Sequence, residues 1–150
     1  MLQRQGAILT FRRSSARPGE IRIAFLIDTW TWIEYWKGAN KKAIQIIDES
    51  TEQFMVSSIT IADIAQIYRQ RDKRLVTVRT DDVAARAEVV PVTFEIARLA
   101  GQLRNTEIDG GIADAIILAT ARLTLSKIVT GDQHFKGKKK RRISRCMSAG

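Results

Sequence analysis

The chain has 150 residues and a formal net charge of +9, with 45% hydrophobic residues, nine Gly and two Pro. This length and composition describe one globular domain with a sizeable core, and they exclude a disordered or fibrous protein. The single cysteine, Cys146, cannot close an internal disulfide, so a reducing cytoplasm is the expected location. The early apolar runs, Gly6–Phe11 and Ile23–Ile27, are far shorter than the roughly 20 residues of a membrane span, and no membrane segment or signal peptide is expected.

Positive charge is concentrated at the two ends of the chain. Residues 1–22 and 136–150 together carry twelve Lys and Arg against one Glu, which leaves the residues between them with a net charge of −2. We therefore expect a basic N-terminal extension over 1–22, a nearly neutral domain over 23–137 and a basic tail over 138–150. Such ends either are solvated or bind RNA phosphates, and the sequence favours neither.

The first half of the domain alternates apolar runs with amphipathic segments. Ile23–Ile27 is apolar throughout, as in a parallel strand buried on both faces. A capping box at Thr31–Glu34 then predicts the start of a helix that ends at Gly38. The elements expected next are a helix over Ala39–Ser50, a strand over Phe54–Ser57, and a helix that begins at Thr60–Asp63 and runs to about Arg69.

The second half repeats this alternation. Gln70–Arg79 is polar and predicts a loop or a helical connection. The elements expected after it are a strand over Val89–Val92, helices over Thr93–Arg104 and Ile112–Leu123, and a strand over Lys127–Thr130. Strands separated by helices imply right-handed crossovers, so the expected fold is a three-layer α/β/α domain with a mostly parallel central sheet.

Four aspartates stand at the boundaries of these elements: Asp28, Asp63, Asp114 and Asp132. Asp28 and Asp132 directly follow strands, and sites in parallel sheets lie at the C-terminal ends of the strands. Converging carboxylates stay ionised when a hard cation such as Mg²⁺ or Mn²⁺ lies between them. A bound cation lowers the pKa of a water and stabilises charge on a phosphodiester, so the pattern indicates a metal-dependent hydrolase.

Each aspartate also has a structural explanation. Asp28 could cap the following helix, Asp63 could complete a capping box with Thr60, and Asp132 could be a turn residue. Asp114 carries the stronger functional signal, because it shares a helix face with Ile117 and other apolar residues, where an unpaired acid is costly to bury.

Other chemistries fit the sequence poorly. An aspartyl phosphatase of the haloacid dehalogenase type needs a second acid where Trp30 stands, and the only histidine, His134, is expected at a pocket mouth or in solvent. No Walker or GxGxxG loop is present. The aromatic residues that follow Asp28 could stack on bases, but their helical spacing favours a core or a dimer face: Trp30, Trp32, Tyr35 and Trp36.

These acids and their neighbours resemble the PIN domain, in particular VapC-type toxins. The resemblance rests on four blocks in the family's order: Phe25–Tyr35, Ser58–Asp63, Gly111–Ala121 and Val129–Phe135. It implies a dimeric Mg²⁺- or Mn²⁺-dependent endoribonuclease that a VapB-type antitoxin holds inactive.

The resemblance also implies the site residues. Asp28, Asp114 and Asp132 match the metal ligands, Thr130 matches a small hydroxyl residue beside them, and Asp63 stands where the family most often has Glu. Glu34 is a further candidate beyond the ligands, although its place in the expected capping box favours a structural role.

The family usually closes with an apolar strand, which the basic and polar 138–150 segment does not predict. A catalytically impaired PIN-like module that binds RNA or protein is therefore the alternative.

Overall fold

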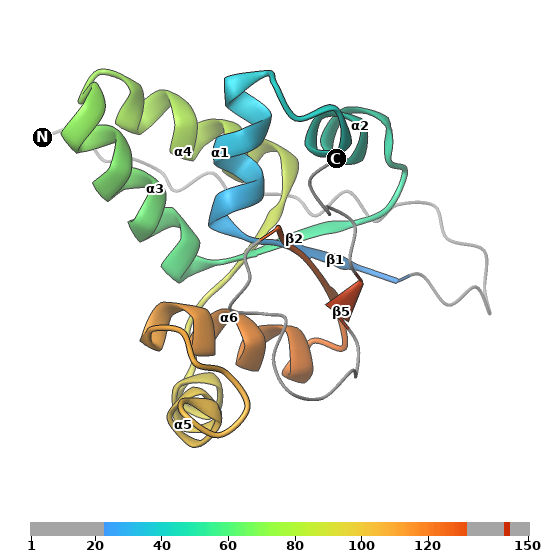
Figure 1. Ribbon diagram of the computed structural model, residues 1–150, viewed down its shortest axis with the longest axis vertical. Helices are drawn as coiled ribbons and strands as arrows, with labels where there is room; N and C mark the ends of the chain where they lie inside the picture. Colours follow the sequence, from blue (N-terminus) through green and yellow to red (C-terminus); the bar gives the residue numbers. More distant parts are fainter. Residues whose placement is uncertain (1–22, 132–142, 145–150) are drawn as a thin grey trace, which may run out of the picture.

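The sheet lies between two groups of helices, in three layers (Figure 1). The computed structural model describes residues 23–131 and 143–144. The strands are β1 (Phe25–Ile27), β2 (Phe54–Ser57), β3 (Glu88–Val90), β4 (Lys127–Val129) and β5 (Ile143–Ser144). The helices are α1 (Thr29–Lys37), α2 (Lys41–Glu49), α3 (Ser58–Arg71), α4 (Leu75–Arg86), α5 (Phe94–Leu103) and α6 (Ile112–Leu123). The predicted three-layer α/β/α fold is confirmed.

All strand pairs in the described residues are parallel, in the order β3-β2-β1-β4-β5. Leu26 of β1 aligns with Met55 of β2 on one side and with Ile128 of β4 on the other. The chain therefore builds outward from β1 in one direction and later returns to its other side at β4. This reversal between β1 and β4 is the position where open α/β sheets place their sites.

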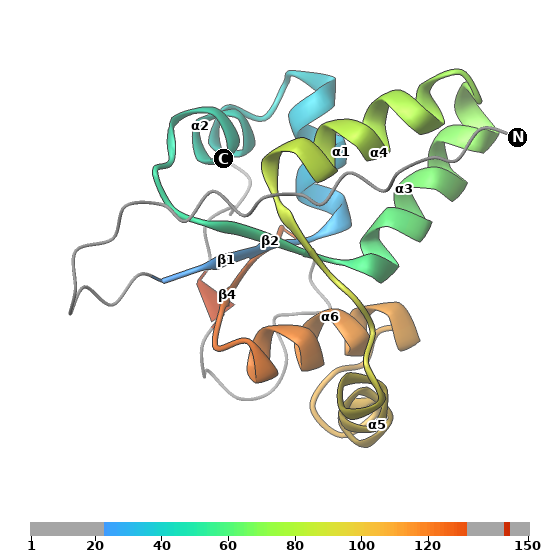
Figure 2. The same ribbon diagram turned by 180° about the vertical axis from the view of Figure 1, so that it is seen from behind.

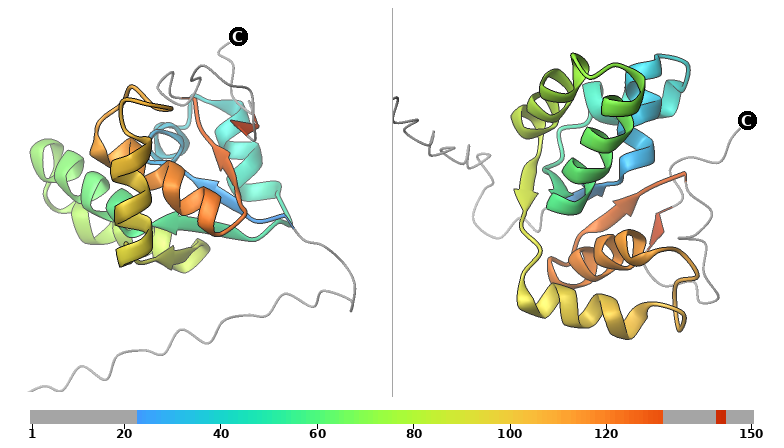
Figure 3. Two further views of the ribbon diagram at one scale, coloured as in Figure 1. Left: turned by 90° about the horizontal axis from the view of Figure 1, so that it is seen from below. Right: turned by 90° about the vertical axis from the view of Figure 1, so that its left-hand side faces the viewer.

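Successive side chains along each strand point to opposite faces of the sheet, so the core is divided into two clusters. Ile27 and Val129 face the layer of α1, α2, α3 and α4, whereas Leu26 and Ile128 face α5 and α6. All four side chains are almost completely buried. Figure 2 shows the same separation from behind, and Figure 3 shows it from below and from one side, with α5 and α6 packed together on one face of the sheet.

Helix α1 begins three residues earlier than the capping box at Thr31–Glu34 predicted. The Asp28 side chain accepts a hydrogen bond from the Thr31 backbone N–H at 2.8 Å, so Asp28 is the N-cap. Thr31 Oγ1 instead donates to the Val129 carbonyl at 3.1 Å and joins α1 to β4. The predicted end is confirmed, because Gly38 adopts a positive φ of 73° that favours glycine.

Helix α3 also begins earlier than predicted. Ser57 is its N-cap and accepts a hydrogen bond from the Ile59 backbone N–H. Asp63 therefore lies in the second turn, and the capping box predicted between Thr60 and Asp63 is wrong.

Helix α4 covers part of the segment predicted as a loop or a helical connection. Its first turn contains β-branched residues of modest helix propensity, and Arg74 at its N-cap makes no capping hydrogen bond. Tertiary contacts hold it instead: Trp36 Nε1 of α1 donates to Asp82 at 2.8 Å. The Arg79 guanidinium lies over the rings of Trp36 and Tyr68, at 5.0 and 5.6 Å from their centroids.

Most helix and strand bounds lie close to those expected from the sequence. Helix α6 and strand β2 have the predicted bounds, β1 and β4 are two residues and one residue shorter than predicted, and β3 is shorter and begins one residue earlier. The sequence did not predict a closing strand, but Ile143–Ser144 pairs with β4 as a short fifth strand. Within the described residues, no helix is both long and apolar enough to cross a membrane.

Candidate active site

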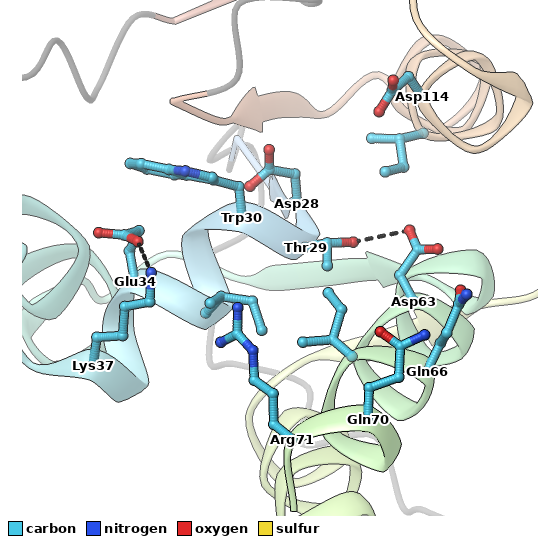
Figure 4. Close-up of a pocket in the computed structure, with 13 residues that line it drawn as sticks. Asp28, Thr29, Trp30, Glu34, Lys37, Asp63, Gln66, Gln70, Arg71 and Asp114 are labelled. Carbon is cyan, nitrogen blue, oxygen red and sulfur yellow. Dashed lines mark hydrogen bonds and ion pairs between the residues drawn. The ribbon is translucent and has the colours of Figure 1, made fainter.

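A pocket of about 510 Å³ opens at the C-terminal edge of the sheet. Its walls come from Asp28 at the end of β1, from α1 and α3 in one helical layer, and from α6 in the other (Figure 4). Asp28, Asp63 and Asp114 border it. Three of the four predicted acids, separated by up to 86 positions in the sequence, thus line one cavity.

Asp28 is held in place from three directions. Its Oδ1 accepts from the Thr31 backbone, its Oδ2 accepts from the Thr130 hydroxyl, and its own N–H donates to the Val129 carbonyl at 3.2 Å. Only 2% of the residue is exposed. The Asp28 carboxylate therefore both caps α1 and lines the pocket. The capping bond helps to hold it in the orientation that reaches Thr130 at the end of β4.

Asp63 projects from α3 toward the N-terminus of α1. Thr29 Oγ1 donates to its Oδ2 at 3.2 Å, as Figure 4 shows. Burial raises the pKa of the Asp63 carboxyl, the Thr29 hydrogen bond opposes this, and the negative charge of Asp114 raises the pKa further. Ionisation of Asp63 is thus disfavoured chiefly by burial, and a cation in the pocket would favour it.

Asp114 stands in the first turn of α6, where the Gly111 N–H donates to its Oδ2 at 3.2 Å. A Cβ added to Gly110 would lie 2.2 Å from the same oxygen. Residue 110 must therefore lack a side chain for the Asp114 carboxylate to keep its position. The acid expected on the apolar face of this helix lies at the edge of that face, in the pocket.

Trp30 lines the pocket beside Asp28 and packs against the chain that leaves β4. A Cβ on Gly131 would lie 2.4 Å from its ring, so glycine permits this close approach. Of the other aromatic residues, Trp32 is fully buried in the core, as predicted, and Tyr35 and Trp36 pack against the same core cluster. Asp132 and His134 lie outside the described residues.

The far end of the pocket contains Glu34, which the sequence offered as a further candidate, and four residues that carried no functional signal in the sequence. Glu34 accepts from Lys37 Nζ at 2.9 Å, and both line the pocket with Gln66, Gln70 and Arg71. The α3 residues follow Asp63 at positions i+3, i+7 and i+8, the spacing of one helix face. This spacing was visible in the sequence, but nothing there showed which face of α3 meets α1.

A family comparison matches residues 25–140 to the PIN domain. The chain belongs to the PIN domain family. Among curated proteins, none matches the chain.

Solved structures share the fold of this PIN domain at low sequence identity. A toxin–antitoxin complex from Klebsiella pneumoniae has a TM-score of 0.66 and 22% identity, over 83% of this chain and 98% of that one. DNA-bound VapBC from Salmonella typhimurium has a TM-score of 0.65 and 22% identity, over 81% of this chain and 95% of that one. VapC20 from Mycobacterium tuberculosis, a sarcin–ricin loop cleaving toxin, has a TM-score of 0.64 and 16% identity, over 75% of this chain and 92% of that one.

The donor chemistry of the PIN domain pocket suits Mg²⁺ or Mn²⁺. Within residues 23–131 and 143–144, no three His, Cys, Asp or Glu side chains come together as a direct metal cluster. Mg²⁺ does not require one, because it usually keeps several waters and takes one or two carboxylates together with substrate phosphates. The pKa of Asp63 is raised mainly by burial and further by the charge of Asp114, and a cation beside these carboxylates would favour their ionised form.

Proposed function

We propose that this PIN domain is a metal-dependent endoribonuclease and the toxin of a VapBC-type toxin–antitoxin pair. The observation that carries the proposal is the placement of Asp28, Asp63 and Asp114, from three different elements, around one pocket at the reversal point of the sheet. Family membership supports the nuclease class, and the toxin–antitoxin structures that share the fold support the biological role.

The reaction proposed is hydrolysis, in which water adds to phosphorus and the bond from phosphorus to the leaving sugar oxygen breaks. Asp28, Asp114 and Asp132 would hold one or two cations, and Asp63 supports them. When bound, Mg²⁺ or Mn²⁺ lowers the pKa of water and stabilises the negative charge of the transition state. Thr130 and the Thr31 backbone fix both oxygens of Asp28, so this carboxylate is oriented before substrate arrives.

The same proposal includes the partners. A VapB-type antitoxin would inhibit the enzyme, and two copies of the chain would form a homodimer in the cytoplasm, where the RNA substrate is found. Glu34 is not assigned a direct role, because it already pairs with Lys37.

The test is cleavage of a mixed RNA substrate by the purified full chain with Mg²⁺, with Mn²⁺ and with EDTA. Asp28→Asn and Asp114→Asn should each abolish cleavage while melting as cooperatively as the wild type. Asparagine can still cap α1 through its amide oxygen and still accept the Gly111 N–H, so both changes remove charge and keep these backbone contacts. At position 28 the amide NH₂ replaces the oxygen that accepts from Thr130, so that hydrogen bond has to reverse, with the Thr130 hydroxyl as acceptor. Asp81→Asn, an exposed acid on α4 that does not line the pocket, is the matched control and should cleave normally.

Cleavage that survives EDTA or Asp114→Asn would refute the proposal. A folded protein that cleaves no RNA with either metal would instead identify the alternative, a module that binds RNA or protein without cutting it. DNA substrates in parallel reactions distinguish ribonuclease from deoxyribonuclease, because both chemistries would use the same acids.

A further inference from the structure

The pocket is a groove between α1 and α3. Each of its two long walls is formed by side chains from one face of one of these helices. The α1 wall is formed by Trp30, Ile33, Glu34 and Lys37, at positions i, i+3, i+4 and i+7. The α3 wall is formed by Asp63, Gln66, Ile67, Gln70 and Arg71, with the same periodicity. Since both helices start beside the carboxylates, the groove runs from their N-terminal ends toward their C-terminal ends, as Figure 4 shows.

This groove has opposite charges at its two ends. The three aspartates border one end, and Lys37 and Arg71 lie near the other. Lys37 is neutralised by Glu34 at 2.9 Å. Arg71 forms no ion pair with any residue that the structure describes. Arg71 is thus the cation of the groove that remains available to an anion from outside the domain.

The space between the two ends suits a nucleotide. Ile67, which is only partly buried, supplies apolar surface on which a base can lie, and the amides of Gln66 and Gln70 can both donate and accept hydrogen bonds. Asp63 and Arg71 are eight residues apart on α3, which is about 12 Å along the helix axis. A strand whose cleaved phosphate sits at the carboxylates would therefore pass Arg71 with a phosphate farther along.

We propose that Arg71 binds a backbone phosphate of single-stranded RNA outside the cleaved bond and sets the direction in which the strand enters the site. The proposal rests on the proposed function for its substrate class. An anionic strand is favoured over a peptide, because the acidic end of the groove accepts a phosphate once a cation is bound, and the basic end accepts the next anion of the same polymer. Arginine, with its planar fork of donors, suits this contact.

The chain offers a closely matched control. Arg69 lies in the same last turn of α3 and is exposed like Arg71, but it does not line the pocket. Arg69→Gln and Arg71→Gln remove the same charge from the same helix end, so they differ only in the face that they alter. Arg71→Lys keeps the charge at the groove without the fork of donors.

The experiment measures binding of a fluorescent single-stranded RNA of one fixed sequence to the full chain in EDTA, over a series of salt concentrations. One lost phosphate contact reduces the slope of log affinity against log salt by about 0.7 for a single strand. We expect that reduction for Arg71→Gln, no change for Arg69→Gln and recovery of the slope for Arg71→Lys. RNAs with a neutral methylphosphonate at one position at a time should identify a position that weakens binding to the wild type but not to Arg71→Gln.

Equal slopes for Arg69→Gln and Arg71→Gln would overturn the proposal. It would also be overturned if Arg71→Gln left RNA binding intact and weakened only the binding of the antitoxin, which would make Arg71 part of a peptide site. Because the measurement is made in EDTA, it is independent of cleavage. A chain that fails to cut RNA but shows the Arg71-specific slope would refute the nuclease and retain this RNA contact.

Discussion

Thr130 donates a buried hydrogen bond to the carboxylate of Asp28, across 102 positions of sequence. The two residues follow β4 and β1, the adjacent parallel strands between which the chain order reverses. The hydroxyl and the Thr31 N–H take one carboxylate oxygen each, so the orientation of Asp28 is determined by the sheet and by α1 together. The site is therefore connected directly to the pairing of the two central strands.

Thr130→Val keeps the branched shape of the side chain and removes this hydrogen bond. Loss of a hydrogen bond that orients a metal-binding carboxylate typically weakens metal affinity or activity by about 10- to 100-fold. We expect a loss in that range, measured as the Mg²⁺ concentration needed for half-maximal cleavage, with Thr130→Ser close to the wild type. Unchanged metal dependence in Thr130→Val would show that the hydroxyl does not orient the site.

Asp63→Asn should raise the melting temperature of the protein in EDTA at neutral pH. Burial and the charge of Asp114 raise the pKa of Asp63 despite the Thr29 hydrogen bond, so the ionised carboxylate destabilises the metal-free fold. The gain should shrink as the pH falls below the raised pKa toward 3.8, because the wild-type carboxyl then becomes neutral. Thermal melts across this pH range check the sign, and a gain that grows on acidification would contradict it.

Metal should stabilise the wild type and should stabilise Asp63→Asn less. Free Mg²⁺ at ten times its dissociation constant contributes about 1.4 kcal/mol to the folded state. This corresponds to a rise of roughly 5 °C in the melting temperature for a domain of this size. Melts with Mg²⁺, Mn²⁺ and Ca²⁺ measure the shift, and Asp81→Asn should behave like the wild type. Equal shifts for wild type and Asp63→Asn would exclude Asp63 from the metal site.

Two glycine substitutions should change stability in opposite directions. Gly131→Ala places a methyl group 2.4 Å from the Trp30 ring and should cost about 1–3 kcal/mol. Gly101→Ala, within α5 and with no atom in 4 Å of the added carbon, should stabilise the protein by about 0.5–1 kcal/mol. Urea denaturation measures both. Adding Trp30→Ala to Gly131→Ala should recover part of the loss, and purely additive effects would show that the ring is not the obstacle.

Asp82→Asn should be less stable than the wild type by about 1 kcal/mol at neutral pH. Burial alone would raise the pKa of Asp82, but hydrogen bonds from Trp36 and Arg86 and the charge of Arg86 lower it overall. The advantage of the charged carboxylate is therefore complete above its ordinary pKa of 3.8 and is lost as the pH falls through the lowered value. Urea denaturation at neutral and strongly acid pH should show the two proteins converging in acid.

The strands and most helices could be predicted because their apolar runs are local features of the sequence. Helix α6 was predicted with its bounds, since its apolar residues recur at helical spacing. Helix α4 was not, because its first turn has weak helical propensity and its stability comes from Asp82 and Arg79 contacting Trp36 of α1. The sequence offered both Asp28 and Thr31 as caps of α1, because both side chains can cap a helix, and only the contact of Thr31 with Val129 distinguishes them.

The candidate acids were visible in the sequence as charged residues at the ends of apolar segments. Their convergence depends on which strands pair, and the sequence contains no local signal for the placement of β4 beside β1. Arg71 was overlooked for a related reason, since an arginine in a polar helix end is ordinary until the packing of α1 on α3 shows that it lines the pocket.

The order of the sheet also constrains how the protein folds while it is being synthesised. β1 and β2 leave the ribosome early, but β4 can pair with the other side of β1 only after residue 129 has been added. A nascent chain that has reached α6 already contains Asp28, Asp63 and Asp114, yet it lacks the strand that bonds to the backbone of Asp28 and the hydroxyl that orients its carboxylate. The contacts that hold Asp28 therefore cannot form until Val129 and Thr130 have been synthesised, after the three acids themselves.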